Sequence, residues 1–149
     1  MPLSVGSLAP NFTALDTTGT VRSLSDFAGK TVVLYFYPKD DTPVCTKEAC
    51  SFRDNYSAYK GKDIVVLGVS ADDVASHQSF SQKFHLPFPL LADPDGSVIR
   101  AYDVQREGYD QPIASRVTYV IDPSGVITHV YTAVQTETHA QDILSALGL

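Results

Sequence analysis

Long apolar runs and segments with helical spacing alternate along the 149-residue chain. Two runs, residues 31–37 and 64–69, are almost continuously apolar, which is typical of strands covered on both faces of a sheet. Apolar side chains then recur at helical spacing from about 43 to 59, and this spacing predicts a helix. A second helix follows the other run, with Asp72 or Asp73 suited to cap its first turn. Its apolar stripe consists of Val74, His77, Phe80 and Phe84.

Shorter elements are predicted for the rest of the chain. They are a hairpin of strands 12–15 and 21–24, a helical turn at 25–29, a strand at 90–92, a brief helix at 98–102, a hairpin of strands 116–121 and 126–131, and a last helix from Thr136. Strands that alternate with helices, followed by a hairpin and a closing helix, indicate an α/β fold with helices around a central mixed β-sheet. The pattern leaves the strand order open. The length fits one domain, residues 1–149.

Composition excludes several classes of function. The chain is 44% hydrophobic and 19% charged, which is ordinary for a soluble globular protein. A net charge of −6 and a pI near 4.9 argue against nucleic acid or an anionic membrane as a partner. No apolar run approaches the roughly 20 residues of a membrane span. The first residues have neither a basic head nor an apolar stretch, so we expect a cytoplasmic protein without a secretion signal.

The chemistry is expected at the only two cysteines, Cys45 and Cys50. Cys45 falls in the opening turn of the helix that follows the first long strand, after a loop stiffened by Pro38 and Pro43. The unpaired N–H groups and the dipole at a helix N-terminus favour negative charge, so this position favours a thiolate. Cys45 is therefore the candidate nucleophile.

The spacing of the two cysteines limits how they can react with each other. Five residues on a regular helix separate the two Cα atoms by roughly 8 to 9 Å, beyond the ~7 Å that a disulfide tolerates. A disulfide between Cys45 and Cys50 therefore requires the first turn to unwind. The spacing favours a helix with two states, which is folded when the two cysteines are reduced and locally unfolded when they are oxidised. Alternatively, Cys50 is a packing cysteine without a redox role.

Other side chains of the helix and of a later strand are candidates to assist Cys45. A helix terminus supplies only about 0.3–1 kcal/mol, so a fast thiol needs a cation or further hydrogen bonds. Thr42 lies three residues before Cys45, and its hydroxyl can reach a substrate beside the thiol. Arg116 opens a strand that can neighbour the 31–37 strand and deliver a guanidinium to the thiolate. Glu48 could orient this arginine, or it is simply an exposed helix carboxylate.

The remaining charged and titratable residues are expected to be bystanders. The loop and helix charges Lys39, Asp40, Asp41 and Lys47 are interpreted as solvated. The four histidines have no metal-ligand spacing and are expected to be solvated or half-packed; they are His77, His85, His129 and His139. We therefore expect neither a metal nor another cofactor.

Three stretches carry a resemblance to a known family. They are Tyr35-Phe36-Tyr37-Pro38, residues 42–54 (TPVCTKEACSFRD) and residues 116–125 (RVTYVIDPSG), with softer similarity at 9–12 and 90–96. In these the chain resembles the peroxiredoxins, specifically the Q-type or bacterioferritin-comigratory-protein group. The resemblance implies a thioredoxin-like fold, a three-layer α/β sandwich with an N-terminal β-hairpin. It also implies a thiol peroxidase that reduces hydrogen peroxide and alkyl hydroperoxides in antioxidant defence.

The resemblance also implies a role for each candidate residue. Cys45 would be the peroxidatic nucleophile and Cys50 the resolving cysteine, and the Cys45–Cys50 disulfide would be recycled by thioredoxin or a similar dithiol. The active site would be completed by Thr42, Pro38 and Arg116, with Glu48 as the partner of the arginine. Val44 departs from the glycine usual in this group. A β-branched residue there should stiffen the loop and slow the unwinding.

Two alternative functions remain open at this stage. A thioredoxin-like dithiol–disulfide oxidoreductase is disfavoured because the chain has no Cys-x-x-Cys motif. A non-catalytic redox sensor would use the Cys45–Cys50 switch to alter a surface rather than to turn over peroxide. Because both cysteines lie in one predicted helix, no second chain is needed, and we expect a monomer.

Overall fold

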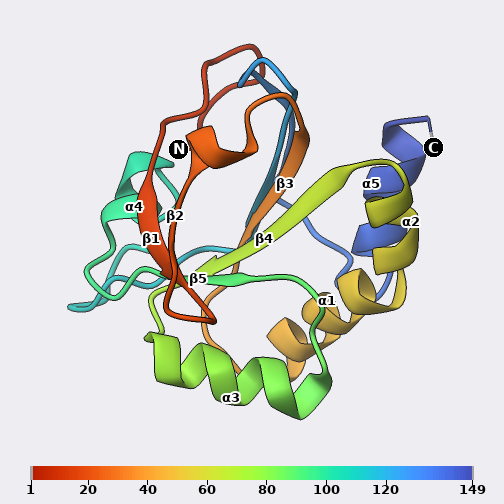
Figure 1. Ribbon diagram of the computed structural model, residues 1–149. Helices are drawn as coiled ribbons and strands as arrows, with labels where there is room; N and C mark the ends of the chain where they lie inside the picture. Colours follow the sequence, from red (N-terminus) through yellow and green to blue (C-terminus); the bar gives the residue numbers. More distant parts are fainter. Residues whose placement is uncertain (1, 149) are drawn as a thin grey trace.

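The computed structural model describes residues 2–148 of the chain, in which one seven-stranded sheet is flanked by helices (Figure 1). The strands are β1 (Thr13–Asp16), β2 (Val21–Ser23), β3 (Thr31–Phe36), β4 (Ile64–Ser70), β5 (Leu90–Ala92), β6 (Val117–Ile121) and β7 (Ile127–Tyr131). The helices are the 3₁₀ helix η1 (Leu24–Phe27), α1 (Pro43–Asp54), α2 (Tyr56–Gly61), α3 (Val74–Phe84), α4 (Ser97–Ala101) and α5 (His139–Ala146).

The sheet is mixed, as the alternation of strands and helices predicted. Its order is β2-β1-β5-β4-β3-β6-β7, with β3, β4 and β5 parallel and the other pairs antiparallel. The two continuous apolar runs form β3 and β4 in the middle of the sheet, where both faces are covered. The N-terminal hairpin β1–β2 and the hairpin β6–β7 lie at opposite edges. The strand that follows Arg116 thus pairs with β3, as expected.

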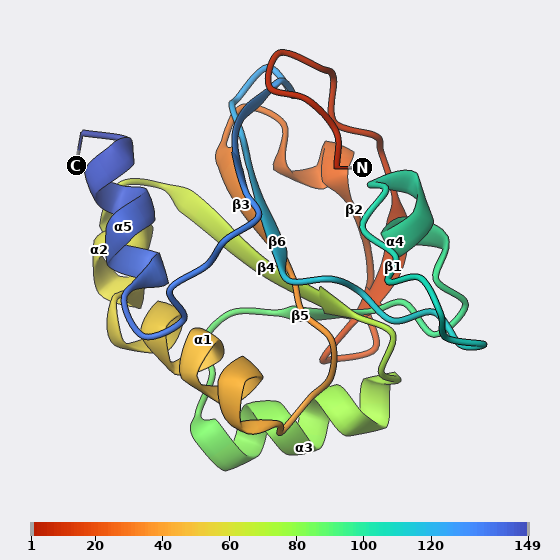
Figure 2. The same cartoon turned by 180° about the vertical axis from the view of Figure 1, so that it is seen from behind.

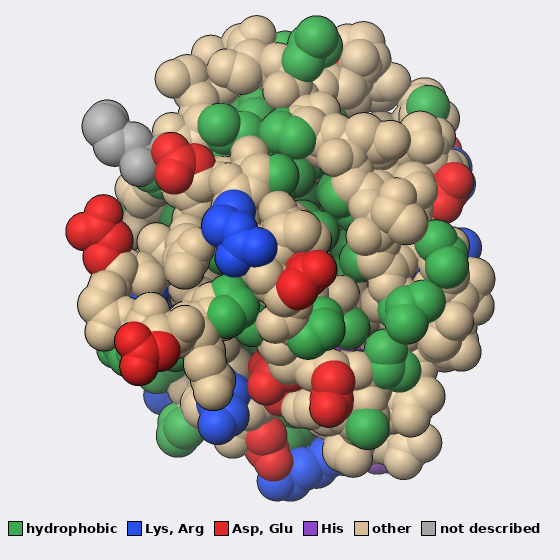
Figure 3. Space-filling view, turned by 90° about the vertical axis from the view of Figure 1, so that its left-hand side faces the viewer, with side chains coloured by type: hydrophobic (Ala, Val, Ile, Leu, Met, Phe, Trp, Pro, Cys, Tyr) green, Lys and Arg blue, Asp and Glu red, His purple; other side chains and the backbone are tan. Residues whose placement is uncertain are grey.

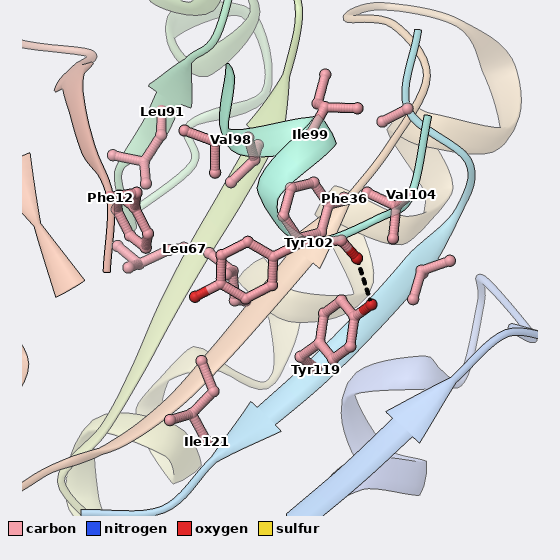
Figure 4. Packing of buried hydrophobic residues seen from close by; sticks show 14 of the residues in the cluster. Phe12, Phe36, Leu67, Leu91, Val98, Ile99, Tyr102, Val104, Tyr119 and Ile121 are labelled. Atoms are coloured by element: carbon pink, nitrogen blue, oxygen red, sulfur yellow. Dashed lines mark hydrogen bonds between the residues drawn. The ribbon is translucent and has the colours of Figure 1, made fainter. Parts of the chain in front are cut away.

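The alternation of side chains along β3 divides the core between the two faces of the sheet. Val32, Leu34 and Phe36 face the cluster that packs against α4, where the Tyr119 hydroxyl donates a hydrogen bond of 2.7 Å to the carbonyl of Tyr102 (Figure 4). Val33 and its neighbours at i+2 and i+4 face the opposite cluster, beneath α1, α2, α3 and α5 (Figure 2). The helix that carries both cysteines therefore lies on the second face.

One aromatic stack joins α1 to the sheet. Tyr35 on β3 stacks on Phe52 of α1, with ring centroids 4.7 Å apart. Gly68 lies opposite Tyr35 in the β3–β4 register, and a Cβ at this glycine would lie 2.8 Å from the Tyr35 hydroxyl. The absence of a side chain at Gly68 therefore leaves room for the ring on which α1 is seated.

Two predicted helix boundaries were wrong. The helix expected over 43–59 is divided at Asn55, whose side-chain amide donates a hydrogen bond of 2.9 Å to the carbonyl of Ser51. An asparagine side chain that competes for a helix carbonyl commonly ends a helix in this way. The last helix begins at His139 rather than Thr136, because a turn closed by the Thr138 N–H and the Gln135 carbonyl takes up the preceding residues.

The face of the molecule drawn in Figure 3 has no cluster of basic side chains, which is consistent with the net negative charge of the chain. Over α4 and the β1–β2 hairpin, acidic and basic side chains are interspersed with hydrophobic ones (Figure 3). Within residues 2–148, none of the helices combines the length and the apolar character that crossing a membrane requires.

Candidate active site

Cys45 lies at the third position of α1, and the local sequence explains why this helix end is open. Thr42 is the N-cap with extended backbone angles (φ −94°, ψ 153°), and Pro43 occupies the first turn. The Thr42 hydroxyl does not cap the helix; it donates instead to the Lys39 carbonyl at 3.1 Å. The first intrahelical bond runs from the Thr46 N–H to the Thr42 carbonyl at 2.8 Å. The N–H groups of Val44 and Cys45 therefore precede the helical ladder and are oriented for a bound oxygen.

Arg116 reaches this thiol because of the pairing between β3 and β6. Val117 is opposite Phe36 in the antiparallel register, so the residue before β6 lies where β3 ends and the active-site loop begins. Nη2 of Arg116 lies 3.1 Å from Sγ of Cys45, and Nη1 donates a bond of 2.6 Å to Oε1 of Glu48. The planar guanidinium thus holds both groups at once, through two nitrogens in a fixed geometry.

Glu48 is fully buried, so its interpretation as an exposed helix carboxylate is wrong. Burial raises the pKa of Glu48 to about 7, although the adjacent Arg116 acts to lower it. Burial acts to lower the pKa of Arg116, but Glu48 and Cys45 outweigh it, and the pKa is raised overall. Arg116 therefore stays cationic. Oε2 of Glu48 accepts no hydrogen bond from the described residues.

His139 of α5 is a neighbour of this site that the sequence analysis missed. Its side chain is buried rather than solvated or half-packed, with Nε2 at 2.8 Å from the Thr118 hydroxyl and at 4.0 Å from Oε2 of Glu48. Burial lowers the pKa of His139 to about 4, with Asp142 opposing and Arg116 reinforcing the shift, so the ring is neutral at pH 7. One signal was present: His139 lies four residues before Ile143 and hence on the buried face of α5.

A second buried polar group lies under the active-site loop. Asp40 was expected to be solvated, but it is 7% exposed, and its carboxylate contacts the fully buried His77 of α3 at 2.7 Å. The position of His77 on the apolar stripe of α3 was the available signal. The other two histidines, His85 and His129, are exposed and half-buried, as expected.

Asp40, His77 and Asp72 bring three possible metal-ligating atoms within 4.8 Å of one another. These atoms are already engaged with protein groups. Asp72 Oδ2 accepts hydrogen bonds from the Asp40 N–H at 2.8 Å and from the Ser70 hydroxyl at 2.6 Å. The cluster is therefore built as a hydrogen-bonded unit, and the expectation that no metal is needed stays a prediction.

Pro38 lies half-buried between this cluster and solvent. It lines a pocket of about 320 Å³ together with Lys39, Asp72, Arg106 and Ile113. Pro38 thus forms a rigid wall of the loop and, because proline has no N–H, it contributes no backbone donor there.

Cys50 lies half-buried in the same intact helix, and both cysteines are free thiols. Burial raises the pKa of the Cys50 thiol, Arg53 opposes this effect, and Asp54 adds to it. The folded helix therefore keeps Cys50 protonated and separate from Cys45. Unwinding would expose Cys50 and remove the burial that raises its pKa.

The sequence matches a model of the AhpC/TSA family over residues 5–130, most of the chain. The chain belongs to this family. A relative from Coxiella burnetii named as a peroxiredoxin bcp is 46% identical and covers 99% of this chain and 100% of its own length. The chloroplastic peroxiredoxin Q of Triticum aestivum is 45% identical and covers 97% of this chain and 67% of its own length.

Solved peroxiredoxin structures have the same fold as this peroxiredoxin. A cysteine-to-serine mutant of PrxQ from Xylella fastidiosa superposes with a TM-score of 0.91 at 32% identity, over 98% of this chain and 96% of that one. The peroxidoxin BcpB of Mycobacterium tuberculosis gives 0.90 at 33% identity, over 97% and 96%. The thioredoxin-like α/β fold is thereby confirmed, and the family is one of thiol-dependent peroxidases.

Proposed function

We propose that this peroxiredoxin reduces hydrogen peroxide and alkyl hydroperoxides with Cys45 as the attacking nucleophile and serves in antioxidant defence. One observation carries the proposal: the Arg116 guanidinium contacts Sγ of Cys45 at 3.1 Å while it is fixed by Glu48 at 2.6 Å. A cation held in this way stabilises a thiolate and, beside it, the negative charge that develops when an O–O bond breaks.

The first chemical step is a displacement at oxygen. The Cys45 thiolate attacks the terminal oxygen of the hydroperoxide, an S–O bond forms, and the O–O bond breaks. The leaving alkoxide or hydroxide takes up a proton and departs as alcohol or water, and the sulfur is oxidised to a sulfenic acid. Arg116 and the N–H groups of Val44 and Cys45 are the donors for the leaving oxygen.

Thr42 supplies the complementary contact. Because its hydroxyl hydrogen is directed to the Lys39 carbonyl, the oxygen presents lone pairs toward a neighbouring donor. The O–H of the attacked hydroperoxide is such a donor. Thr42 therefore orients the terminal oxygen, and Pro38 limits water on one side of the loop.

Cys50 completes the cycle by resolving the sulfenic acid. Its thiol attacks the Cys45 sulfur, a disulfide forms, and the oxygen leaves as water. The first turns of α1 must unwind, and Glu48, between the two cysteines, must leave its buried site. The end of the helix is better anchored, because the Ser51 hydroxyl accepts a hydrogen bond from the Ala140 N–H at 3.2 Å and Phe52 is fully buried. A thioredoxin-like dithiol then reduces the disulfide.

Mass spectrometry of the thiols after one equivalent of hydrogen peroxide tests this scheme. We expect the reduced chain to lose two hydrogens as the Cys45–Cys50 disulfide forms, and thioredoxin to restore both thiols and sustain turnover. Cys45→Ser is the matched control and should consume no peroxide. Full peroxide consumption by Cys45→Ser contradicts the assignment.

The thioredoxin step of this experiment, together with a separate insulin-reduction assay, distinguishes the alternative functions. A single stoichiometric oxidation that thioredoxin cannot reverse favours a redox sensor, and fast reduction of insulin disulfides favours a dithiol oxidoreductase. The cytoplasmic location and the monomeric state stay predictions. Sedimentation of the reduced chain at micromolar concentration tests the second of them.

A further inference from the structure

We propose that Asp40, Asp72 and His77 form a positioning unit that sets the Thr42 hydroxyl for the peroxide. We call these three residues the loop clamp. The inference rests on the proposed function, since it assigns a role in the orientation of the substrate. None of the three side chains makes a hydrogen bond to Cys45 or Arg116 among the described residues. Their effect therefore has to pass through the loop.

The connection between the clamp and Thr42 is a single peptide group, the one that joins Lys39 to Asp40. Its N–H donates to Asp72 Oδ2 at 2.8 Å, and its C=O accepts from the Thr42 hydroxyl at 3.1 Å. Because a peptide group is planar and rigid, fixing its N–H also fixes the direction of its C=O. Asp72 thus determines where the Thr42 hydroxyl hydrogen points.

The Asp40 side chain holds this peptide group in place from the other direction. Oδ1 accepts a bond of 2.6 Å from the Tyr37 hydroxyl, and Oδ2 accepts one of 2.8 Å from the Ser76 hydroxyl. Oδ2 also lies 2.7 Å from Nδ1 of His77. The carboxylate therefore ties the loop to the end of β3 and to the first turn of α3.

His77 contacts protein groups through both of its ring nitrogens. Its Nε2 faces the Leu91 carbonyl at 2.9 Å, and a carbonyl is an acceptor, so Nε2 carries a hydrogen. Its Nδ1 lies 2.7 Å from Asp40 Oδ2, which is within hydrogen-bond distance. The ring thus spans from β5 to the loop with both nitrogens engaged, and it is rigidly held.

Loss of the clamp should leave Thr42 without a fixed partner. If the 39–40 peptide group turns, the Lys39 carbonyl moves away, and the Thr42 hydroxyl can rotate and present its hydrogen to the substrate. The peroxide O–H then loses its acceptor. Arg116 and the helix end still stabilise the Cys45 thiolate, because their contacts do not involve the clamp. The clamp should therefore govern the reaction with peroxide and not the intrinsic reactivity of the thiol.

The test compares two reactions of the same thiol in the full reduced chain. Peroxide oxidation requires an oriented O–O bond. Alkylation by iodoacetamide requires only the Cys45 thiolate and does not depend on the Thr42 contact. His77 is fully buried and its removal endangers folding, so the variants are placed at the half-buried Asp72. Asp72→Ala removes the acceptor of the Asp40 N–H, and Asp72→Asn keeps an acceptor oxygen while it removes the charge.

We expect Asp72→Ala to slow oxidation of Cys45 by hydrogen peroxide by about 10- to 100-fold, as misplacement of a reacting group by about 1 Å can do. The iodoacetamide rate should change less than about twofold, since the thiolate contacts are retained. Asp72→Asn should restore most of the peroxide rate. Lys83→Met is the matched control, because Lys83 contacts the same loop through exposed Asp41 at 2.8 Å, and neither rate should change.

A double-mutant cycle shows whether the clamp acts through Thr42. Thr42→Val removes the hydroxyl at nearly constant size, and Asp72→Ala in that background should slow the peroxide reaction no further. Three results would overturn the proposal: additive losses in the double variant, equal losses of both rates in Asp72→Ala, or an unchanged peroxide rate in Asp72→Ala. A slow peroxide reaction of the unmodified chain would instead contradict the proposed function.

Discussion

Replacing Glu48 by glutamine should remove a pH-dependent loss of stability. Glu48 is fully buried between the two cysteines, and burial raises its pKa from 4.5 to about 7. Below pH 4.5 the carboxyl is protonated in both the folded and the unfolded chain. As the pH rises, the unfolded chain releases the proton first, so the free energy of unfolding falls until the folded carboxyl also ionises near pH 7.

The size of the effect follows from the two pKa values. The interval between the pKa values of 4.5 and about 7 corresponds to a decrease of about 3 kcal/mol in the free energy of unfolding. This decrease is complete slightly above pH 7. In a chain of this length that equals roughly 6–12 °C in Tm. The amide introduced by Glu48→Gln cannot ionise, and its oxygen can still accept the bond from Arg116. The variant should therefore gain about 3 kcal/mol relative to the unmodified chain between pH 4.5 and 7.5.

Urea unfolding of both chains in steps from pH 4.5 to 8, with the thiols kept reduced, measures this difference. His139, whose pKa burial lowers to about 4, also titrates near this range and destabilises the fold as the pH falls below about 6.5. Because His139 is present in both chains, its effect largely cancels in the difference. A difference that is constant with pH, or that falls as the pH rises, would refute the reasoning, since Arg116 would then hold Glu48 ionised in the folded state at no cost.

Three further outcomes follow from the site. Arg116→Lys should lower kcat/KM for hydrogen peroxide by about 10- to 100-fold in steady-state assays, because an ammonium lacks the rigid two-nitrogen fork that positions Sγ of Cys45 and Oε1 of Glu48 together; an unchanged value would contradict the two-contact role. Val44→Gly should speed disulfide formation by about 1.5- to 2-fold in quenched-flow mass spectrometry, since glycine is less favourable than valine in a helix by roughly 0.3–0.4 kcal/mol; a slower reaction would argue against unwinding as the limiting step. Cys50→Ser should allow one oxidation per chain and then stop without another thiol; continued turnover with thioredoxin alone would exclude Cys50 as the necessary resolving thiol.

The sequence predicted the parts of the site that depend on local pattern and on simple sheet pairing. The apolar run before the cysteines became β3, and the strand after Arg116 became its antiparallel neighbour, which brings the guanidinium to Cys45. Burial of polar side chains could not be predicted in the same way. The position of His77 on an apolar stripe hinted at its burial, but its pairing with Asp40, 37 positions away, is a long-range contact that no local pattern shows.

The ends of the helices were also not predicted correctly, for a related reason. The apolar stripe continues past residue 55, and it predicted one helix where two are present. Asn55 ends the first helix through a side-chain bond to Ser51, a competition that apolar periodicity does not register. The shorter α1 lies entirely within residues 43–54, so the segment that must unwind is a terminal half of a short helix.

The central claim is that Cys45 is held as a reactive thiolate that splits a bound peroxide. Its most direct test is the rate at which Cys50→Ser consumes hydrogen peroxide in competition with a haem peroxidase, with the product trapped by dimedone and located by mass spectrometry. We predict one sulfenic acid per chain, on Cys45, formed on the order of a thousandfold faster than on free cysteine at the same pH, as oriented donors at the leaving oxygen allow. Oxidation at the rate of free cysteine would contradict the account.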